Sequence, residues 1–181
     1  IETAYTLRLK YKGKKVSIQL LTNVRSGNCS QNCAYCAQSC ESQAQIEKYK
    51  RVSDEKLYGD NDLVDNKHLA RHCIGLSGIS FTDAEIEDLA GRIRKMKKND
   101  TQICCSIGFL TEKQALMLKE AGLNRINHNL NSSRRFYPNI CTTHTYDQRI
   151  NNIRMLKRIM LKSAILKIFS ALTLMLLFQA I

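Results

Sequence analysis

Proline and tryptophan are nearly missing from this sequence of 181 residues, which has one proline, Pro138, and no tryptophan. A chain of this length with average composition would carry about nine prolines. The shortage excludes proline-rich linkers, and the length is that of one domain. The hydrophobic fraction of 44% is typical of a globular protein and excludes wholesale disorder.

Cysteine is too sparse for a disulfide-stabilised scaffold. The eight cysteines make up about 4% of the chain, against roughly 8–10% in small disulfide-rich proteins. The first residues also lack the basic, apolar and small-residue pattern of a secretory signal. We therefore expect reduced thiols and a cytoplasmic protein, in which clustered cysteines indicate metal binding or catalysis.

Acidic residues are outnumbered by basic ones, 16 against 28, which gives a formal net charge of +12. Such a charge suits an anionic ligand or partner without identifying one. A solvated lysine-rich surface explains it as well. We do not expect nucleic acid to be a partner.

Short apolar segments alternate with amphipathic ones along most of the chain. Strands are predicted at residues 16–22, 72–77, 102–107 and 124–130. Helices are predicted to begin at Thr82 and Thr111, both capping-box patterns, and to cover 146–161. Residues 41–67 are polar and are predicted to be irregular, with short helical pieces.

The strand–helix rhythm predicts the fold class. It is typical of an α/β protein whose parallel strands are joined by crossover helices. About four such units are present, whereas a complete (β/α)8 TIM-type barrel has eight units and about 250 residues. We therefore predict a partial barrel. Within it, the helix after Thr82 is expected to expose basic residues that include Arg92 and Arg94.

Three segments differ in composition. Residues 1–15 form a basic N-terminal extension, 16–162 form the partial barrel domain, and 163–181 form an apolar tail. The apolar stretch 164–181 has the minimum length of a membrane span but contains Lys167. A truncated or frame-shifted sequence, a packed core element and a membrane helix all fit this tail. We do not expect it to cross a membrane.

The most specific motif is a C-x3-C-x2-C sequence formed by Cys29, Cys33 and Cys36, directly after the first predicted strand. Three thiolates on one loop can hold three irons of a cubane cluster and leave the fourth iron open. Cys40 as a fourth ligand would give a closed electron-transfer cluster instead. Zinc usually requires a second Cys-x2-Cys pair, which this sequence lacks.

With Tyr35 before its last cysteine, this motif resembles the signature of the radical S-adenosylmethionine (SAM) enzymes. Longer segments resemble one family of that group, the biotin synthases. They are Asn-His-Asn-Leu at 127–130, the stretch 132–146, and Cys-Cys-Ser-Ile-Gly at 104–108 with Thr-Glu-Lys-Gln-Ala at 111–115. The resemblance covers residues from about 16 to about 162.

The resemblance implies a barrel of the radical SAM type with a [4Fe-4S] cluster on Cys29, Cys33 and Cys36. SAM would bind the open iron, and an electron from a flavodoxin or ferredoxin would cleave it to a 5′-deoxyadenosyl radical. The radical would act on dethiobiotin, and an auxiliary [2Fe-2S] cluster would supply the sulfur of biotin. The unpaired edge of a partial barrel also favours association, for example as a homodimer.

The family also implies ligands for the auxiliary cluster. Cys73 and Cys104 match two of its cysteines. Strand alternation allows only one of Cys104 and Cys105 as a ligand, because adjacent residues face opposite sides, and the resemblance favours Cys104. No cysteine follows Cys141, so the family's third cysteine has no counterpart, and neither has its arginine ligand. Two alternatives stay open: a related radical SAM enzyme of rearrangement or cofactor maturation, and an inactive iron–sulfur-binding fragment.

Contacts to SAM and substrate are implied for five further residues. They are Tyr35, Asn127, Asn129, Asn131 and Arg149. Asn131 stands where the family has an acidic residue. His128 is predicted to face away from the asparagines and to pack, and no role is assigned to Cys40, Cys141 or His144.

Overall fold

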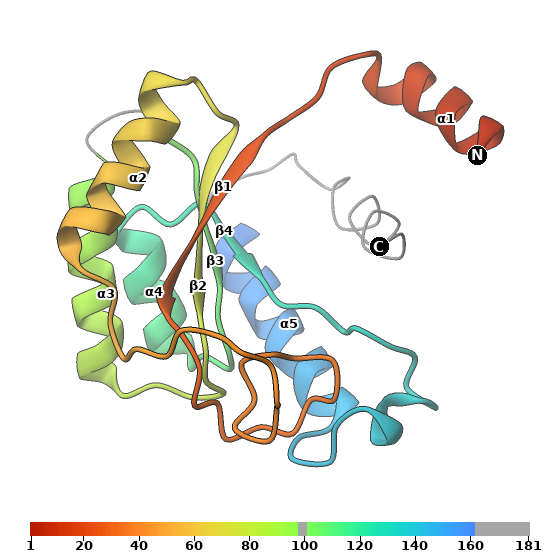
Figure 1. Ribbon diagram of the computed structural model, residues 1–181, viewed down its shortest axis with the longest axis vertical. Coiled ribbons are helices and arrows are strands. Elements are labelled where there is room, and N and C mark those ends of the chain that lie inside the picture. The colour runs from red at the N-terminus through yellow and green to blue at the C-terminus, as the bar shows by residue number, and fades with distance from the viewer. Residues whose placement is uncertain (98–100, 162–181) are drawn as a thin grey trace.

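Strands and helices alternate along most of the chain (Figure 1). The computed structural model describes residues 1–97 and 101–161, so the apolar tail 163–181 lies outside the described residues. The elements are α1 (Glu2–Lys12), β1 (Gln19–Arg25), α2 (Asp54–Asn66), β2 (Arg71–Leu76), α3 (Asp83–Met96), β3 (Ile103–Ser106), α4 (Glu112–Glu120), β4 (Arg125–Asn127), the 3-10 helix η1 (Tyr137–Asn139) and α5 (Tyr146–Leu161).

The four strands form one parallel sheet in the order β1-β2-β3-β4. Each neighbouring pair is joined by a helix, as parallel pairing requires. Successive helices pack against one another, α2 on α3, α3 on α4 and α4 on α5. The predicted fold class, an α/β partial barrel of about four units, is confirmed.

Local signals in the sequence fix several helix ends. Both predicted capping boxes are present, at Thr82 with Glu85 and at Thr111 with Gln114. Helix α4 ends at Glu120, and just beyond its C-cap Gly122 has a φ of 101°, which suits a residue without a side chain. The N–H of the next residue, Leu123, donates to the Leu118 carbonyl, which completes the C-terminal cap.

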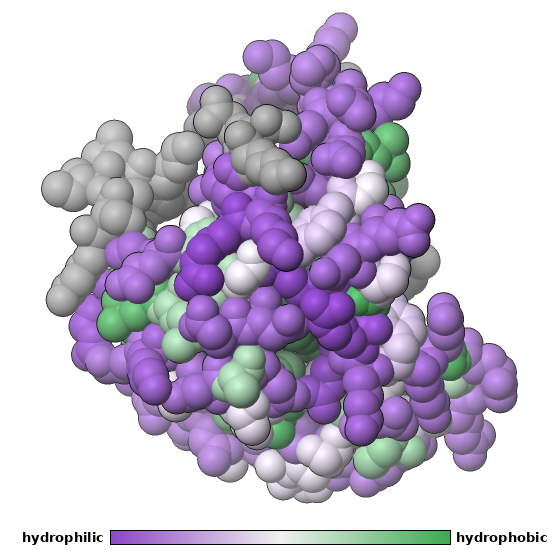
Figure 2. Space-filling view, turned by 90° about the vertical axis from the view of Figure 1, so that its left-hand side faces the viewer, coloured by the Kyte–Doolittle hydropathy of each residue, from purple (hydrophilic) through white to green (hydrophobic). Residues whose placement is uncertain are grey.

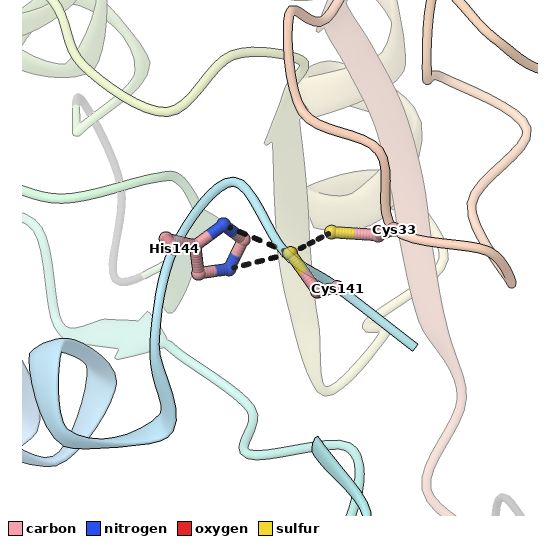
Figure 3. Close-up of side chains that lie close together, drawn as sticks. All are labelled: Cys33, Cys141 and His144. Atoms are coloured by element: carbon pink, nitrogen blue, oxygen red, sulfur yellow. Dashed lines mark hydrogen bonds between the residues drawn. The ribbon is translucent and has the colours of Figure 1, made fainter. Parts of the chain in front are cut away.

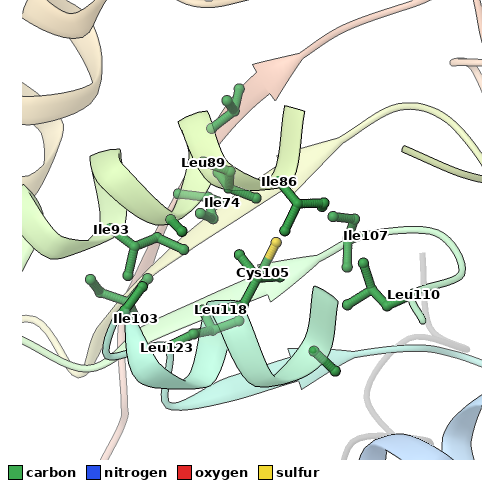
Figure 4. Packing of buried hydrophobic residues seen from close by; sticks show 14 of the residues in the cluster. Ile74, Ile86, Leu89, Ile93, Ile103, Cys105, Ile107, Leu110, Leu118 and Leu123 are labelled. Carbon is green, nitrogen blue, oxygen red and sulfur yellow. The ribbon is translucent and has the colours of Figure 1, made fainter. Parts of the chain in front are cut away.

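The hydrophobic core lies between the sheet and the helices (Figure 4). Ile74, Ile103 and Cys105 point from β2 and β3 toward Ile86 of α3 and Leu118 of α4, and all five are fully buried. Burying each large aliphatic side chain contributes about 1.5–3 kcal/mol. The outer side of the helical layer is mainly hydrophilic, with small scattered apolar patches (Figure 2).

The first strand begins later than predicted. The apolar run 16–22 was expected to be a buried strand, yet Val16 and Ile18 precede β1 and are 76% and 61% exposed. Pairing with β2 begins only at Gln19, opposite Arg71. Because β1 is the edge of the described sheet, only its helix-facing side chains, such as Val24, become buried.

The segment 41–67 is more regular than predicted, since α2 occupies 13 of its residues. The Ser53 side chain accepts a hydrogen bond from the Lys56 N–H and caps the helix. Leu57, Asn61 and Val64 form its buried stripe at helical spacing. Only two residues of this stripe are apolar, which gave too weak a periodic signal to predict the full helix.

Arg92 is buried, which contradicts its predicted exposure. Its side chain is 3% exposed, lies 3.0 Å from the Asp54 carboxylate and donates to the Val52 carbonyl at 2.8 Å. The arginine therefore joins α3 to the start of α2, because a buried guanidinium requires such partners.

The N-terminal extension contains α1, which buries none of its residues and lies apart from the sheet (Figure 1). Across residues 1–97 and 101–161, no helix has both the length and the hydropathy needed to cross a membrane.

Candidate metal centre

The three-cysteine motif lies on the loop at the carboxyl end of β1, which is where (β/α)8 barrels place their active sites. The loop folds back on itself. The Cys29 N–H donates to the Gln38 carbonyl at 2.9 Å, and the Cys40 N–H donates to the Cys29 carbonyl at 2.8 Å. A tight turn closes the end of the motif, with the Cys36 N–H 2.9 Å from the Cys33 carbonyl.

The donor set of this loop fits an iron–sulfur cluster. All three cysteines are free thiols; Cys33 is buried, whereas Cys29 and Cys36 are partly exposed. Their three sulfurs do not all lie within 4.8 Å of one another, in contrast to a second group described below. Ligands to different irons must surround a cluster rather than converge on one ion, and three free thiols on one loop suit the expected [4Fe-4S] group.

The loop between β4 and α5 docks on the cysteine loop through Asn32. The Asn32 carboxamide oxygen accepts hydrogen bonds from the N–H groups of Thr142 at 3.0 Å and Thr143 at 3.3 Å. Its amide donates to the Thr142 hydroxyl at 2.6 Å, and the Ala34 N–H donates to the Ile140 carbonyl at 2.9 Å. Two loops more than 100 residues apart in sequence thus form one surface.

This docking brings together three residues that the sequence analysis did not combine. Cys141 and His144, which were assigned no role, lie next to Cys33, and all three are buried (Figure 3). The Cys33 and Cys141 sulfurs are 3.7 Å apart, and the Cys141 sulfur is 3.2 Å from His144 Nδ1. The available sequence signal was a cysteine and a histidine three positions apart, at 141 and 144, both of which are residue types that bind metals.

Burial and hydrogen bonding shift the pKa values of this group. Burial, with the neighbouring Cys141 sulfur, raises the pKa of Cys33 to about 11. Burial alone would raise the pKa of Cys141, but hydrogen bonds from Thr143, His144 and Cys33 outweigh it and lower this pKa. Burial and the nearby Arg149 lower the pKa of His144 to about 4, so its imidazole is neutral at pH 7.

Residues that are predicted to contact SAM lie beside the cysteine loop. Asn131, at φ 64°, donates a hydrogen bond to the Tyr35 hydroxyl from across the two loops. Arg149, on α5, donates to the Asn129 carbonyl at 3.1 Å and to the Tyr137 hydroxyl at 2.5 Å. The structure therefore places these residues beside the cysteine loop, and their ligand contacts stay a prediction.

Strand β4 is shorter than predicted and ends at Asn127 rather than at residue 130. The asparagines at 129 and 131 therefore do not continue a period-two strand, and Asn131 adopts left-handed backbone geometry. His128 packs on the Phe109 ring at 5.4 Å and lies 3.3 Å from the Ile107 carbonyl. It is thus a packed histidine, as expected.

The two predicted auxiliary cysteines face each other on paired strands. Cys73 of β2 is in register with Cys104 of β3, and their sulfurs are 2.7 Å apart. The Asn127 amide donates to the Cys104 sulfur at 3.2 Å. Hydrogen bonds from Cys73 and then Asn127 lower the pKa of Cys104 to about 7 despite burial. Cys105 lies on the opposite, helix-covered face and is fully buried.

Comparison with known proteins agrees with this geometry. The sequence model of the Radical SAM superfamily matches residues 23–177. Biotin synthase from Bacillus cytotoxicus is 42% identical over 160 residues, and that from Bacillus thuringiensis is 40% identical over 159 residues. Both alignments cover 87% of this chain and 48% of the relative. The chain thus spans about half the length of the curated relatives it matches.

Solved structures give the same fold. A crystal structure of methylornithine synthase (PylB) superposes with a TM-score of 0.74 at 18% identity, covering 87% of this chain and 46% of that one. The [FeFe]-hydrogenase maturase HydG superposes with a TM-score of 0.64 at 16% identity, covering 87% and 36%. The fold, the cysteine loop and the match over residues 23–177 together establish that the chain belongs to the radical SAM superfamily.

Proposed function

We propose that this chain contributes to a biotin-synthase-type enzyme that converts dethiobiotin to biotin by inserting sulfur. The observation that carries the proposal is the pair Cys73 and Cys104, whose sulfurs meet at 2.7 Å on the face of the sheet away from the helices. A radical SAM enzyme without an auxiliary cluster does not need two thiols there. The identity of about 40% to biotin synthases supports the same assignment.

Cys29, Cys33 and Cys36 would hold the [4Fe-4S] cluster. With SAM bound, the cluster supplies the one-electron chemistry that generates a carbon-centred radical, and the protein supplies orientation and shelter from water. The docked loops shield Cys33, which is 8% exposed. Since the motif follows β1 directly, a regular sheet edge fixes the position of the loop.

Arg149 provides the positive charge of the proposed SAM site. Its guanidinium reaches from α5 to the Asn129 carbonyl, beside the cysteine loop. A guanidinium there can bind the carboxylate of SAM through charge-assisted hydrogen bonds. Asn131 and Tyr35, which already bond to each other, would contribute further polar contacts.

Cys73 and Cys104 would provide two ligands of the [2Fe-2S] cluster. The Asn127 amide donates to the Cys104 sulfur, and such hydrogen bonds tune cluster sulfurs. Both cysteines lie within paired strands rather than on the cysteine loop, so substrate would lie between the two clusters. The net charge of +12 would favour an acidic electron donor such as a flavodoxin or ferredoxin.

Anaerobic reconstitution with iron and sulfide tests the cluster assignment. We expect about four irons bound through the three-cysteine motif. Cys36→Ala is expected to abolish this binding and the visible absorbance of the cluster, whereas Cys40→Ala, on the same loop, leaves both unchanged. Full iron content and absorbance in the Cys36→Ala protein would overturn the assignment.

SAM binding by the reconstituted protein tests the role of Arg149. Because charge-assisted hydrogen bonds contribute about 1.5–3 kcal/mol, Arg149→Ala is expected to weaken SAM binding about 10- to 100-fold in equilibrium dialysis. Arg154→Ala is the matched control, since Arg154 is exposed on the same helix. Equal loss of affinity in both variants would show that Arg149 acts only through general charge.

A further inference from the structure

Cys33, Cys141 and His144 form a compact set of donors that the proposed cluster does not use as a set. Cys33 comes from the loop after β1, and the other two come from the loop before α5 (Figure 3). Their donor atoms all lie within 4.8 Å of one another, and each residue is at most 8% exposed. It is the one group of this kind among the residues the structure describes.

The hydrogen bonds around His144 define its protonation state. Its Nε2 lies 3.1 Å from Arg149 Nε and 2.9 Å from the Tyr137 hydroxyl. A guanidinium can only donate, so Nε2 is an acceptor and the proton is on Nδ1. Nδ1 in turn lies 2.8 Å from the Gln31 carboxamide oxygen, which accepts that proton's hydrogen bond. An imidazole fixed in this way, with a lone pair on Nε2, is the form that binds metals.

The distances fit one tetrahedral ion. Zn–S bonds of about 2.3 Å place two thiolates of a tetrahedron about 3.8 Å apart, and a Zn–N bond of about 2.0–2.1 Å places nitrogen about 3.6 Å from sulfur. The Cys33 and Cys141 sulfurs are 3.7 Å apart, and His144 Nε2 is 3.8 Å from the Cys141 sulfur. The two sulfurs therefore already have tetrahedral spacing, whereas the imidazole, whose Nε2 faces Arg149 and Tyr137, must turn toward them on binding.

We propose that Cys33, Cys141 and His144 bind one thiophilic divalent cation, of which Zn²⁺ is the representative, when the iron–sulfur cluster is absent. Two thiolates neutralise the ion, which makes it compatible with the nearby Arg149 guanidinium. On binding, His144 Nε2 exchanges its hydrogen bonds from Arg149 and Tyr137 for the metal. A solvent oxygen completes the tetrahedron.

Because Cys33 is shared, this ion and the [4Fe-4S] cluster exclude each other. The ion would hold the two docked loops together in the protein that has no cluster, and iron loading would require its release. The inference goes beyond the proposed function, since it needs neither SAM nor dethiobiotin.

Cobalt titration of the iron-free protein tests the site, with Co²⁺ as the probe. A Cys29→Ser/Cys36→Ser protein removes the other thiols of the motif and leaves the three proposed donors. We expect it to bind one Co²⁺ per chain with the absorption of tetrahedral cobalt and of thiolate-to-cobalt charge transfer. Adding Cys141→Ser or His144→Gln is expected to weaken binding at least tenfold.

Two matched controls remove cysteines outside the group. Cys40→Ser and Cys104→Ser, each in the same background, are expected to leave the cobalt affinity unchanged. Unchanged affinity in both the Cys141→Ser and the His144→Gln proteins would overturn the proposal. Loss of affinity with Cys104→Ser instead would assign the ion to the sheet thiols and would overturn it as well.

X-ray absorption at the zinc edge of the unsubstituted, iron-free chain gives a test that no folding defect can obscure. Two sulfur donors and one nitrogen donor are expected, whereas three sulfurs with no nitrogen would overturn the proposal. Prior zinc loading should also slow iron incorporation in the unsubstituted chain more than in Cys141→Ser. A failure to bind iron at all would count against the proposed function but not against this site.

Discussion

Two pairs of thiols lie close together in this molecule, and they are held in different ways. Cys73 and Cys104 occupy paired positions on neighbouring strands, so the sheet register alone places their sulfurs 2.7 Å apart. Cys33 and Cys141 are 108 residues apart on two irregular loops, with sulfurs 3.7 Å apart. No strand pairing joins these loops. They are joined by the side-chain hydrogen bonds of Asn32 and by one backbone bond from the Ala34 N–H to the Ile140 carbonyl.

The difference shows which contacts depend on regular backbone structure. The sheet pair requires only correct strand pairing, which the buried core behind it also stabilises. The loop pair depends on a few individual hydrogen bonds, each contributing about 0.5–1.5 kcal/mol. Substitutions at single polar residues should therefore separate the loop thiols while leaving the sheet thiols together.

Asn32→Ala should have the largest effect, because it should separate the loop thiols and leave the sheet thiols together. It removes the acceptor and donor that hold Thr142 and Thr143, so we expect a loss of about 2–4 kcal/mol of loop docking. Oxidised glutathione converts two neighbouring thiols to a disulfide with release of two reduced glutathiones. In a Cys29→Ser/Cys36→Ser background, mass spectrometry should show at least thirtyfold less Cys33–Cys141 disulfide.

The sheet pair serves as the internal reference in that experiment. Formation of the Cys73–Cys104 disulfide should be unchanged by Asn32→Ala. Asn32→Asp keeps an acceptor oxygen for the two threonine N–H groups and should retain most of the Cys33–Cys141 product. Equal loss of both disulfides would mean that Asn32 stabilises the whole fold rather than the loop contact.

Cys105→Ser and Cys104→Ser should differ because the two residues face opposite sides of β3. Cys105 is fully buried among aliphatic side chains, so a serine hydroxyl there would have no polar partner. We expect Cys105→Ser to lower the free energy of unfolding by about 2–3 kcal/mol. Cys104 has polar neighbours, and Cys104→Ser should lower the free energy of unfolding by less than about 1 kcal/mol. Urea unfolding would measure both, and equal costs would contradict the assigned faces.

The smallest effect is expected from a substitution of His128, which lies at the junction between the sheet and the loops, and it concerns the pH dependence of stability. Burial and then Arg149 lower its pKa to about 4, whereas an unfolded histidine titrates near 6.5. The folded protein binds fewer protons in this window, so its stability should fall as pH decreases from about 6.5 to 4. His128→Gln should remove about 1–2 kcal/mol of that dependence, since the residue is only partly buried.

Urea unfolding at several pH values would measure this slope. His68→Gln is the matched control, because it makes the same histidine-to-glutamine change at an exposed position. The same slope in the His128→Gln protein as in the unsubstituted one would show that other groups cause the acid sensitivity.

The sequence predicted regular elements well where the local signal was strong. β2 and β3 lie within one residue of the predicted strands, because each is a short run of buried residues between turns. The helices after Thr82 and Thr111 begin as predicted, since their caps are local hydrogen bonds. Helix α2 was predicted only as short helical pieces, because its packing against the sheet, more than its sequence, distinguishes its buried stripe from a polar loop.

The sequence by itself determined the superfamily, the strand–helix order and the cluster motif, because those depend on spacing within short segments. It also separated Cys104 from Cys105, since alternation along a strand is a local property. Only the tertiary structure decided that Cys141 and His144 stand beside Cys33. That contact depends on how two distant loops pack, and the position of one loop relative to another is determined by the whole fold.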